Sequence, residues 1–209
     1  MPPTGEVRMA TVWVAGWRAF WQAVPNVFRG RRRRTFLSVV ALGLVTGVAV
    51  SAIVYRVGGP GVGGSPYLAV FICVFAVTAA AAGAARVFSL RDRTSQWWIA
   101  GTHETTMKQV LAASQSGSLD TVNPQDLTNA RRAAELLTHS VPATIVSPLI
   151  AAVGAIPLLV LAAAEGSGWL VLIALCVFLA QALEAVSGLL TLGRATLITM
   201  IATDRPTAR

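Results

Sequence analysis

Two polar residues, Gln181 and Glu184, interrupt the otherwise apolar stretch CVFLAQALEAVSG at residues 176–188. Their spacing of three places them on one face of an α-helix, and Ser187 and Thr191 continue the same stripe. A carboxylate and an amide in such a stretch can bind a transported ion or a polar group of a neighbouring helix. Because exposure of these groups to lipid is costly, we expect the stripe to face another helix of this chain or another subunit.

Arg86 is the basic residue that we expect to hold Glu184 inside a helical bundle. Measured from the outer ends of their apolar runs, the two residues differ in depth by about 6 Å at 1.5 Å per residue, which long side chains can cover. The alternative is a protonated carboxyl group bonded to Gln181, Thr46 or a backbone carbonyl, because an isolated carboxylate tends to neutralise in a low dielectric. The sequence leaves open whether Glu184 is ion-paired, protonated or part of a transport path.

The other residues that could do chemistry are isolated from one another. His103 and Glu104 are adjacent and therefore point in different directions from a helix, and His139 stands alone near the end of an apolar run. Ser147 and Thr78 have no base beside them in the sequence. The chain also lacks an HExxH, a CxxC and a glycine-rich phosphate motif. We predict no enzymatic activity, no metal site and no cofactor.

The chain that carries these residues is too apolar for an ordinary soluble domain. Of its 209 residues, 55% are hydrophobic and 12% are charged, and the mean hydropathy is +0.64. Crossing a bilayer takes about 20 mostly apolar residues, and four runs are long enough, at 35–57, 67–87, 141–164 and 169–192. The runs are continuous and do not alternate as barrel strands do. The predicted fold is an all-α membrane protein with four transmembrane helices, in which Cys73 and Cys176 are packing residues.

Basic residues predict the orientation of the spans, because Lys and Arg are retained on the cytoplasmic side. Most of them lie before the first run, between the second and third runs, and after the fourth run, whereas VGGPGVGGSP and EGSG contain none. Only Arg56, at the outer end of the first run, argues the other way. Both termini are therefore expected to be cytoplasmic. The predicted organisation is a cytoplasmic amphipathic helix and polybasic segment (1–34), a first transmembrane hairpin (35–87), a cytoplasmic helical loop (88–139), a second hairpin (140–192) and a cytoplasmic tail (193–209).

The same distribution accounts for the net charge of +8. No groove-reading motif or aromatic-basic sheet pattern accompanies it, so we do not expect nucleic acid as a partner. Arginine outnumbers lysine by 16 to one in an Ala-rich and Gly-rich chain, which is typical of a GC-rich bacterial genome. The expected location is a bacterial inner (plasma) membrane.

The N-terminal segment TVWVAGWRAFWQAVPNVFR has the periodicity of an amphipathic helix. Aromatic residues gather on one side of it, and the block GRRRR follows. We expect this helix to lie in the inner headgroup region and to bind anionic lipid, and Pro25 to kink or end it. The residues assigned to the lipid interface here are Trp13, Trp17, Phe20, Trp21, Arg31, Arg32, Arg33 and Arg34. The alternative is that the aromatic face packs on the cytoplasmic loop of the protein itself.

The loop at 88–139 is expected to contain two helices. The first spans 103–115 with Met107, Val110 and Leu111 on one face, and the second begins at Asn123 and Pro124 and runs to the third span. Trp97 and Trp98 are assigned to the lipid interface as a further anchor.

The chain also resembles itself at an offset of 103 residues. Residues 50–91 align without a gap with 153–194, with eleven identities that include CVF at 73–75 and 176–178. The two hairpins are therefore a predicted internal repeat, related by an axis along the membrane normal.

Two functions are consistent with this pattern. We favour a non-enzymatic accessory, assembly or scaffold protein that binds another membrane protein or complex, with a membrane-protein partner or a homo-oligomer covering the polar stripe. The alternative is a small transporter or channel module with a polar path at Gln181 and Glu184, in which a third span broken by Pro142, Pro148 and Pro157 supplies a movable helix.

Overall fold

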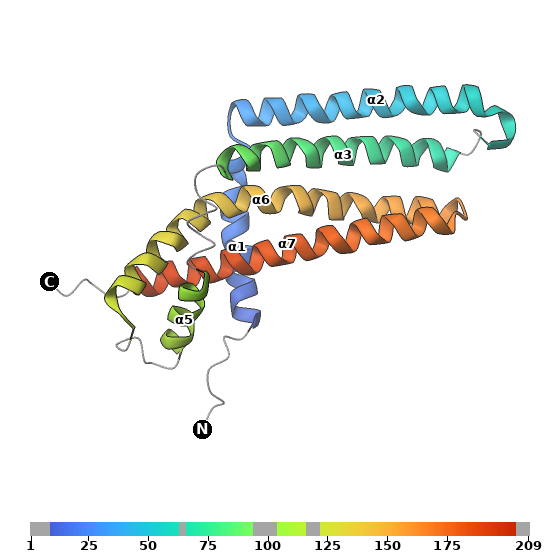
Figure 1. The fold of residues 1–209 in the computed structure, drawn as a ribbon. Helices are drawn as coiled ribbons and strands as arrows, with labels where there is room; N and C mark the ends of the chain where they lie inside the picture. Colours follow the sequence, from blue (N-terminus) through green and yellow to red (C-terminus); the bar gives the residue numbers. More distant parts are fainter. Residues whose placement is uncertain (1–8, 63–65, 94–103, 116–121, 204–209) are drawn as a thin grey trace. The chain divides into compact units, whose positions relative to one another are not determined.

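The computed structural model describes residues 9–62, 66–93, 104–115 and 122–203, and every regular element in these ranges is an α-helix (Figure 1). The helices are α1 (Met9–Val27), α2 (Arg31–Val62), α3 (Pro66–Arg93), α5 (Glu104–Gln115), α6 (Pro124–Ala164) and α7 (Gly168–Thr203). Four of them, α2, α3, α6 and α7, are long and apolar enough to cross a membrane. This confirms the prediction of four apolar helices, as expected of a multi-pass membrane protein.

Both ends of α6 are explained by residues that favour the start or the end of a helix. The Asn123 side chain accepts a hydrogen bond from the Gln125 backbone N–H at 3.0 Å, which caps α6 with Pro124 in its first turn. At the other end of α6, Gly166 has φ of +73°, and the Ser167 N–H reaches the Ala162 carbonyl at 3.2 Å. This is the glycine-dependent arrangement that ends helices and turns the chain into α7.

Three features of the long helices differ from what the sequence predicts. The four arginines at 31–34 form the first turn of α2 instead of a separate segment. The helix α7 continues to Thr203, through the first part of the predicted tail. Finally, α6 is one helix from Pro124 to Ala164, so Pro142, Pro148 and Pro157 do not end it.

The chain divides into two units. Unit 1 comprises Met1–Val27, Ser89–Pro142 and Val186–Arg209, and unit 2 comprises Phe28–Phe88 and Ala143–Ala185. The apolar window of α6 is the most deeply buried, with 44% of its residues buried against 11–17% for the windows of α2, α3 and α7.

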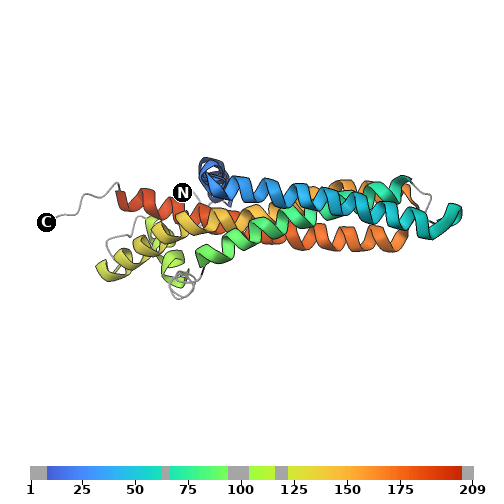
Figure 2. The same cartoon turned by 90° about the horizontal axis from the view of Figure 1, so that it is seen from above.

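In unit 2, α2 and α3 pack closely through small residues (Figures 1 and 2). A Cβ atom on Gly47 would lie 2.9 Å from the Cα of Cys73 and 3.2 Å from the Cβ of Ala76. One turn further along α2, Ser51 Oγ donates to the Gly47 carbonyl at 2.8 Å and lies 3.0 Å from the carbonyl oxygen of Ala69 on α3. The small-residue stripe of α2 therefore allows close helix approach, as its spacing indicates.

The α3 helix also packs on α6 within unit 2. Ser147, which is buried, donates its hydroxyl to the Ala82 carbonyl of α3 at 2.9 Å. A Cβ atom on Gly154 would collide with the Thr78 side chain. The two residues considered above as isolated nucleophiles, Ser147 and Thr78, thus lie in helix–helix contacts.

Within the described residues, unit 1 contains the helix that the sequence predicts at 103–115. The helix α5 spans Glu104–Gln115, and its predicted inner residues Met107, Val110 and Leu111 are all buried. Trp97 and Trp98 lie outside the described residues. The predicted repeat stays a prediction: Cys73 is half-buried with its Sγ 3.4 Å from Ser51 Oγ, whereas its counterpart Cys176 is exposed.

Candidate functional site

The polar stripe of α7 opens onto the surface of the chain. Glu184 is exposed and Gln181 is half-buried. In the described part of the chain, no hydrogen bond or ion pair reaches the Glu184 carboxylate, from Arg86 or from any other residue. The expectation that Glu184 is buried in the bundle and held by Arg86 is therefore wrong.

The rotation of α7 about its axis accounts for these exposures. Ala174 and Ala185 mark the buried side of α7 in unit 2. Successive residues on an α-helix lie about 100° apart. Glu184 precedes Ala185 by one position and so lies about 100° from the buried direction, whereas Gln181 precedes it by four and lies about 40° away. The carboxylate consequently points to the outside of the chain, and the amide lies at the edge of the packed surface.

Ala81, Ala84 and Ala85 form the buried face of α3, and Arg86 is the next residue along the helix. The Arg86 residue itself is exposed. The three residues assigned to the intramembrane polar site are thus a surface pair on α7 and a separate exposed arginine on α3.

The aromatic residues of α1 form a ladder along the helix. Trp13 and Trp17 are stacked with ring centroids 6.4 Å apart, and Trp17 and Trp21 meet edge to face at 5.6 Å. The three tryptophans are 36%, 39% and 52% exposed. Phe20, by contrast, is 2% exposed, so it belongs to the protein core and not to the lipid interface.

Phe20 belongs to a second stripe of α1, with Val12 and Gly16, that is buried within unit 1. Gly16 lies against α7, where a Cβ atom would collide with the Leu189 carbonyl oxygen. A Cβ atom on Gly193 would in turn collide with the Val12 carbonyl oxygen. The two helices therefore cross with their backbones in contact, which only glycine permits at both positions. We did not predict this crossing, although the spacing of four between Val12, Gly16 and Phe20 is a signal that could have revealed it.

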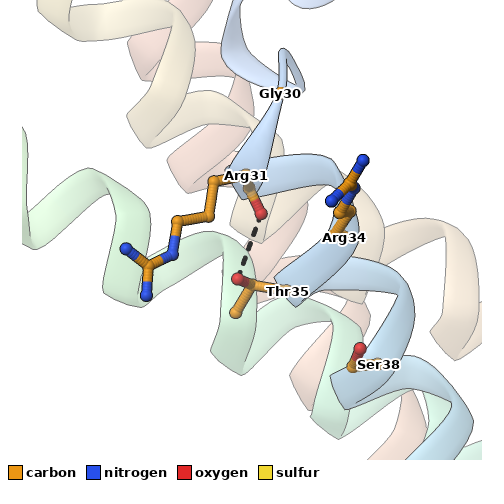
Figure 3. Close-up of a pocket in the computed structure, with 5 residues that line it drawn as sticks. All are labelled: Gly30, Arg31, Arg34, Thr35 and Ser38. Atoms are coloured by element: carbon orange, nitrogen blue, oxygen red, sulfur yellow. Dashed lines mark hydrogen bonds between the residues drawn. The ribbon is translucent and has the colours of Figure 1, made fainter.

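Arg31 and Arg34 line an open surface pocket of about 680 Å³ at the start of α2, together with Gly30, Thr35 and Ser38 (Figure 3). Thr35 Oγ1 donates to the Arg31 carbonyl at 3.1 Å and so reinforces the first turn. The Arg31 and Arg34 side chains extend in different directions from the helix (Figure 3). The two guanidinium groups therefore do not converge on one point.

In the ranges that the structure describes, no group of three or more His, Cys, Asp or Glu residues could hold a metal ion. His139 is exposed on α6, and the ion pair between Arg131 and Glu135, at 2.9 Å, joins two exposed side chains one turn apart.

Comparison of the chain with protein-family models, with curated proteins and with solved structures finds no match. The function is therefore argued from the residues themselves.

Proposed function

We propose that this chain is a non-enzymatic, multi-pass membrane protein that binds another membrane protein or complex, as an accessory, assembly or scaffold protein. The observation that supports this function is the exposed Glu184 carboxylate on the apolar part of α7. A side chain of this kind needs a partner, and the described residues of its own chain do not supply one.

The position of Glu184 along α7 explains why its carboxylate needs a partner. Glu184 lies 15 residues after Trp169, which is about 22 Å along the helix at 1.5 Å per residue. The hydrocarbon core is about 30 Å thick, so with Trp169 at the outer boundary the Glu184 Cα lies inside it. An ionised side chain costs about 2.5–3.5 kcal/mol at the centre of a membrane helix, and such residues face other protein for that reason.

The surface around Glu184 is suited to contact with another transmembrane helix. Ala180 and Ser187 are exposed beside it, and Gln181 and Gly188 are half-buried. Small residues let a second backbone approach, and the amide, hydroxyl and carboxyl groups can bond across the interface. The partner surface is therefore expected to carry a basic or hydrogen-bonding side chain at the depth of Glu184.

We further propose that the protein resides in a bacterial plasma membrane with both termini in the cytoplasm. The support is the placement of arginines before and in the first turn of α2, at the end of α3, in the first part of α6 and late in α7.

The alternative is a small transporter or channel module in which Gln181 and Glu184 line a polar path. The outward position of Glu184 gives this alternative a specific form, because the path would have to lie between copies of the chain. The alternative also invokes movement of the third span at Pro142, Pro148 and Pro157, which all lie within the single helix α6.

Site-specific photo-crosslinking in intact membranes tests the proposal. A photoreactive residue at position 184 should give a stoichiometric adduct with one different membrane protein, and this protein should co-purify in mild detergent until Glu184→Leu abolishes the association. Leu179 is the matched control, because it is 50% exposed on the same helix and lies about 140° around it from Glu184.

The three remaining outcomes are distinguishable. An adduct with a second copy of this chain favours the transporter alternative. Equal adducts from positions 184 and 179 show that the stripe has no special partner. Reaction of position 184 with lipid alone overturns the proposal.

A further inference from the structure

The exposed tryptophans of α1 lie on a helix that is held in one rotation. Its buried stripe, Val12, Gly16 and Phe20, and its exposed stripe, Trp13, Trp17 and Trp21, are neighbours with the same spacing of four. Both stripes are apolar, so amphipathicity alone does not decide which of them faces protein. The tertiary contact decides it.

The backbone contact between α1 and α7 prevents exchange of the two stripes. If α1 rolled by one residue, Trp17 would take the place of Gly16, where even a Cβ atom would collide with the Leu189 carbonyl oxygen. A backbone oxygen inside a helix cannot move aside. The indoles of Trp13, Trp17 and Trp21 are therefore kept on the outside of unit 1.

The chemistry around this ladder identifies what covers it. From residue 9 to residue 34 the chain has six arginines and no acidic residue. One of the arginines, Arg18, is exposed and adjacent to Trp17. An indole buries an apolar ring while its N–H bonds a polar neighbour, so tryptophan is enriched where hydrocarbon meets headgroups. Arginines beside it attract anionic headgroups.

The short connection between α1 and α2 limits how far the C-terminal end of α1 can lie from the start of α2. Val27 ends α1 and Arg31 begins α2, a membrane-spanning candidate. Four residues of extended chain reach at most about 14 Å. The C-terminal end of α1 consequently lies close to the level at which α2 enters the membrane.

We propose that Trp13, Trp17 and Trp21 form a docking surface for the headgroup boundary of an anionic lipid leaflet, and that Phe20 has no part in it. The glycine crossing with α7 aims this surface at the lipid. The docking surface is independent of any partner at Glu184.

The test uses the full chain in lipid nanodiscs. Trp97, Trp98 and Trp169 are replaced by phenylalanine, so that the α1 indoles are the only tryptophans. Fluorescence is then recorded in nanodiscs of phosphatidylglycerol that carries bromine either near the headgroup end or near the end of the acyl chain. We expect the shallow bromines to quench most of the emission and the deep bromines to quench little.

Charge and folding are tested by two further samples. In nanodiscs of brominated phosphatidylcholine alone, shallow quenching should decrease, because the anionic headgroup is absent. If the triple phenylalanine variant does not fold, the difference between the unmodified chain and the Trp13, Trp17 and Trp21→Phe variant supplies the same measurement.

The contrary results are equally definite. Emission that brominated lipid leaves unchanged and that aqueous iodide quenches would show that the ladder faces water. Emission protected from both quenchers would show that protein covers it. Stronger quenching by deep bromines, or equal quenching in the two lipids, would also overturn an anionic headgroup surface.

Discussion

In unit 1 the buried positions include large side chains such as Phe20, Leu192 and Ile198, whereas in unit 2 they are filled mostly by alanine and glycine. Many of the large apolar side chains of unit 2 lie on its outside instead, for example Leu44, which is 51% exposed, and Leu172, which is 62% exposed. A chain in water gains free energy by burying large apolar side chains. In lipid this gain disappears, and close backbone approach through small residues holds helices together.

This difference is what we expect if unit 2 lies in lipid and unit 1 is in contact with water. Unit 2 has the small-residue interior of a membrane bundle. Unit 1 has the large-residue core of a water-soluble domain, and its exposed ion pair between Arg131 and Glu135 agrees with contact with water. The exposed tryptophans of α1 are the feature of unit 1 that this division does not explain, and a lipid boundary accounts for them.

The largest expected effect is the loss of a large core side chain in unit 1. Phe20→Ala should lower the free energy of unfolding by about 3–5 kcal/mol, because a buried aromatic ring is replaced by a cavity. Trp21→Ala on the same helix removes a half-exposed ring that contacts Trp17 and Phe20, and should lower it by only about 0.5–1.5 kcal/mol. Reversible unfolding in mixed micelles measures both. Equal losses would mean that Trp21 is also part of the protein core.

A smaller loss is expected when a side chain is added to the small-residue interior of unit 2. A Cβ atom on Gly43 would lie 2.6 Å from the Ala80 Cβ, so Gly43→Ala should cost about 1–3 kcal/mol through overpacking. Nothing lies within 4 Å of the same atom on Gly83, and Gly83→Ala should stabilise the helix by up to about 1 kcal/mol. The same unfolding experiment compares the two. If Gly43→Ala is tolerated as well as Gly83→Ala, then α2 and α3 do not need close contact.

A third measurement asks whether unit 2 contains a buried charge pair. Glu184→Gln and Arg86→Gln, made singly and together in the isolated chain, should have additive effects within about 0.5 kcal/mol, because the two residues do not interact. If the double mutant recovers much of the stability lost in the single mutants, the two residues form an ion pair after all, and Glu184 needs no partner from another protein.

The smallest effect on stability is expected from thiols that test the orientation of α6. In a chain with Cys73 and Cys176 replaced by alanine, Ser167→Cys lies in the turn after α6 and Thr128→Cys lies in its exposed first part. In intact cells a membrane-impermeant maleimide should label position 167 and should reach position 128 only after lysis. The reverse pattern would place both termini outside.

Much of the fold follows from local sequence. An apolar run of about 20 residues in lipid must satisfy its own backbone hydrogen bonds, so each run can only be a helix. Asn123 with Pro124 starts α6 through its own side chain, and Gly166 ends it through its positive φ. The inner face of α5 could be read from the spacing of Met107, Val110 and Leu111.

What the sequence left undetermined is the rotation of each helix about its axis. Phe20 and Trp21 are adjacent aromatic residues, and apolar periodicity assigns both to the same side of α1. Glu184 and Gln181 are both polar, and the cost of exposing them in lipid predicts that both face protein. Only the crossing of Gly16 with Gly193 turns Phe20 inward and Trp21 outward, and only the packing of Ala174 and Ala185 leaves Glu184 on the surface. These contacts join residues far apart in the chain, and they depend on which backbones can approach one another, which is a property of the assembled helices.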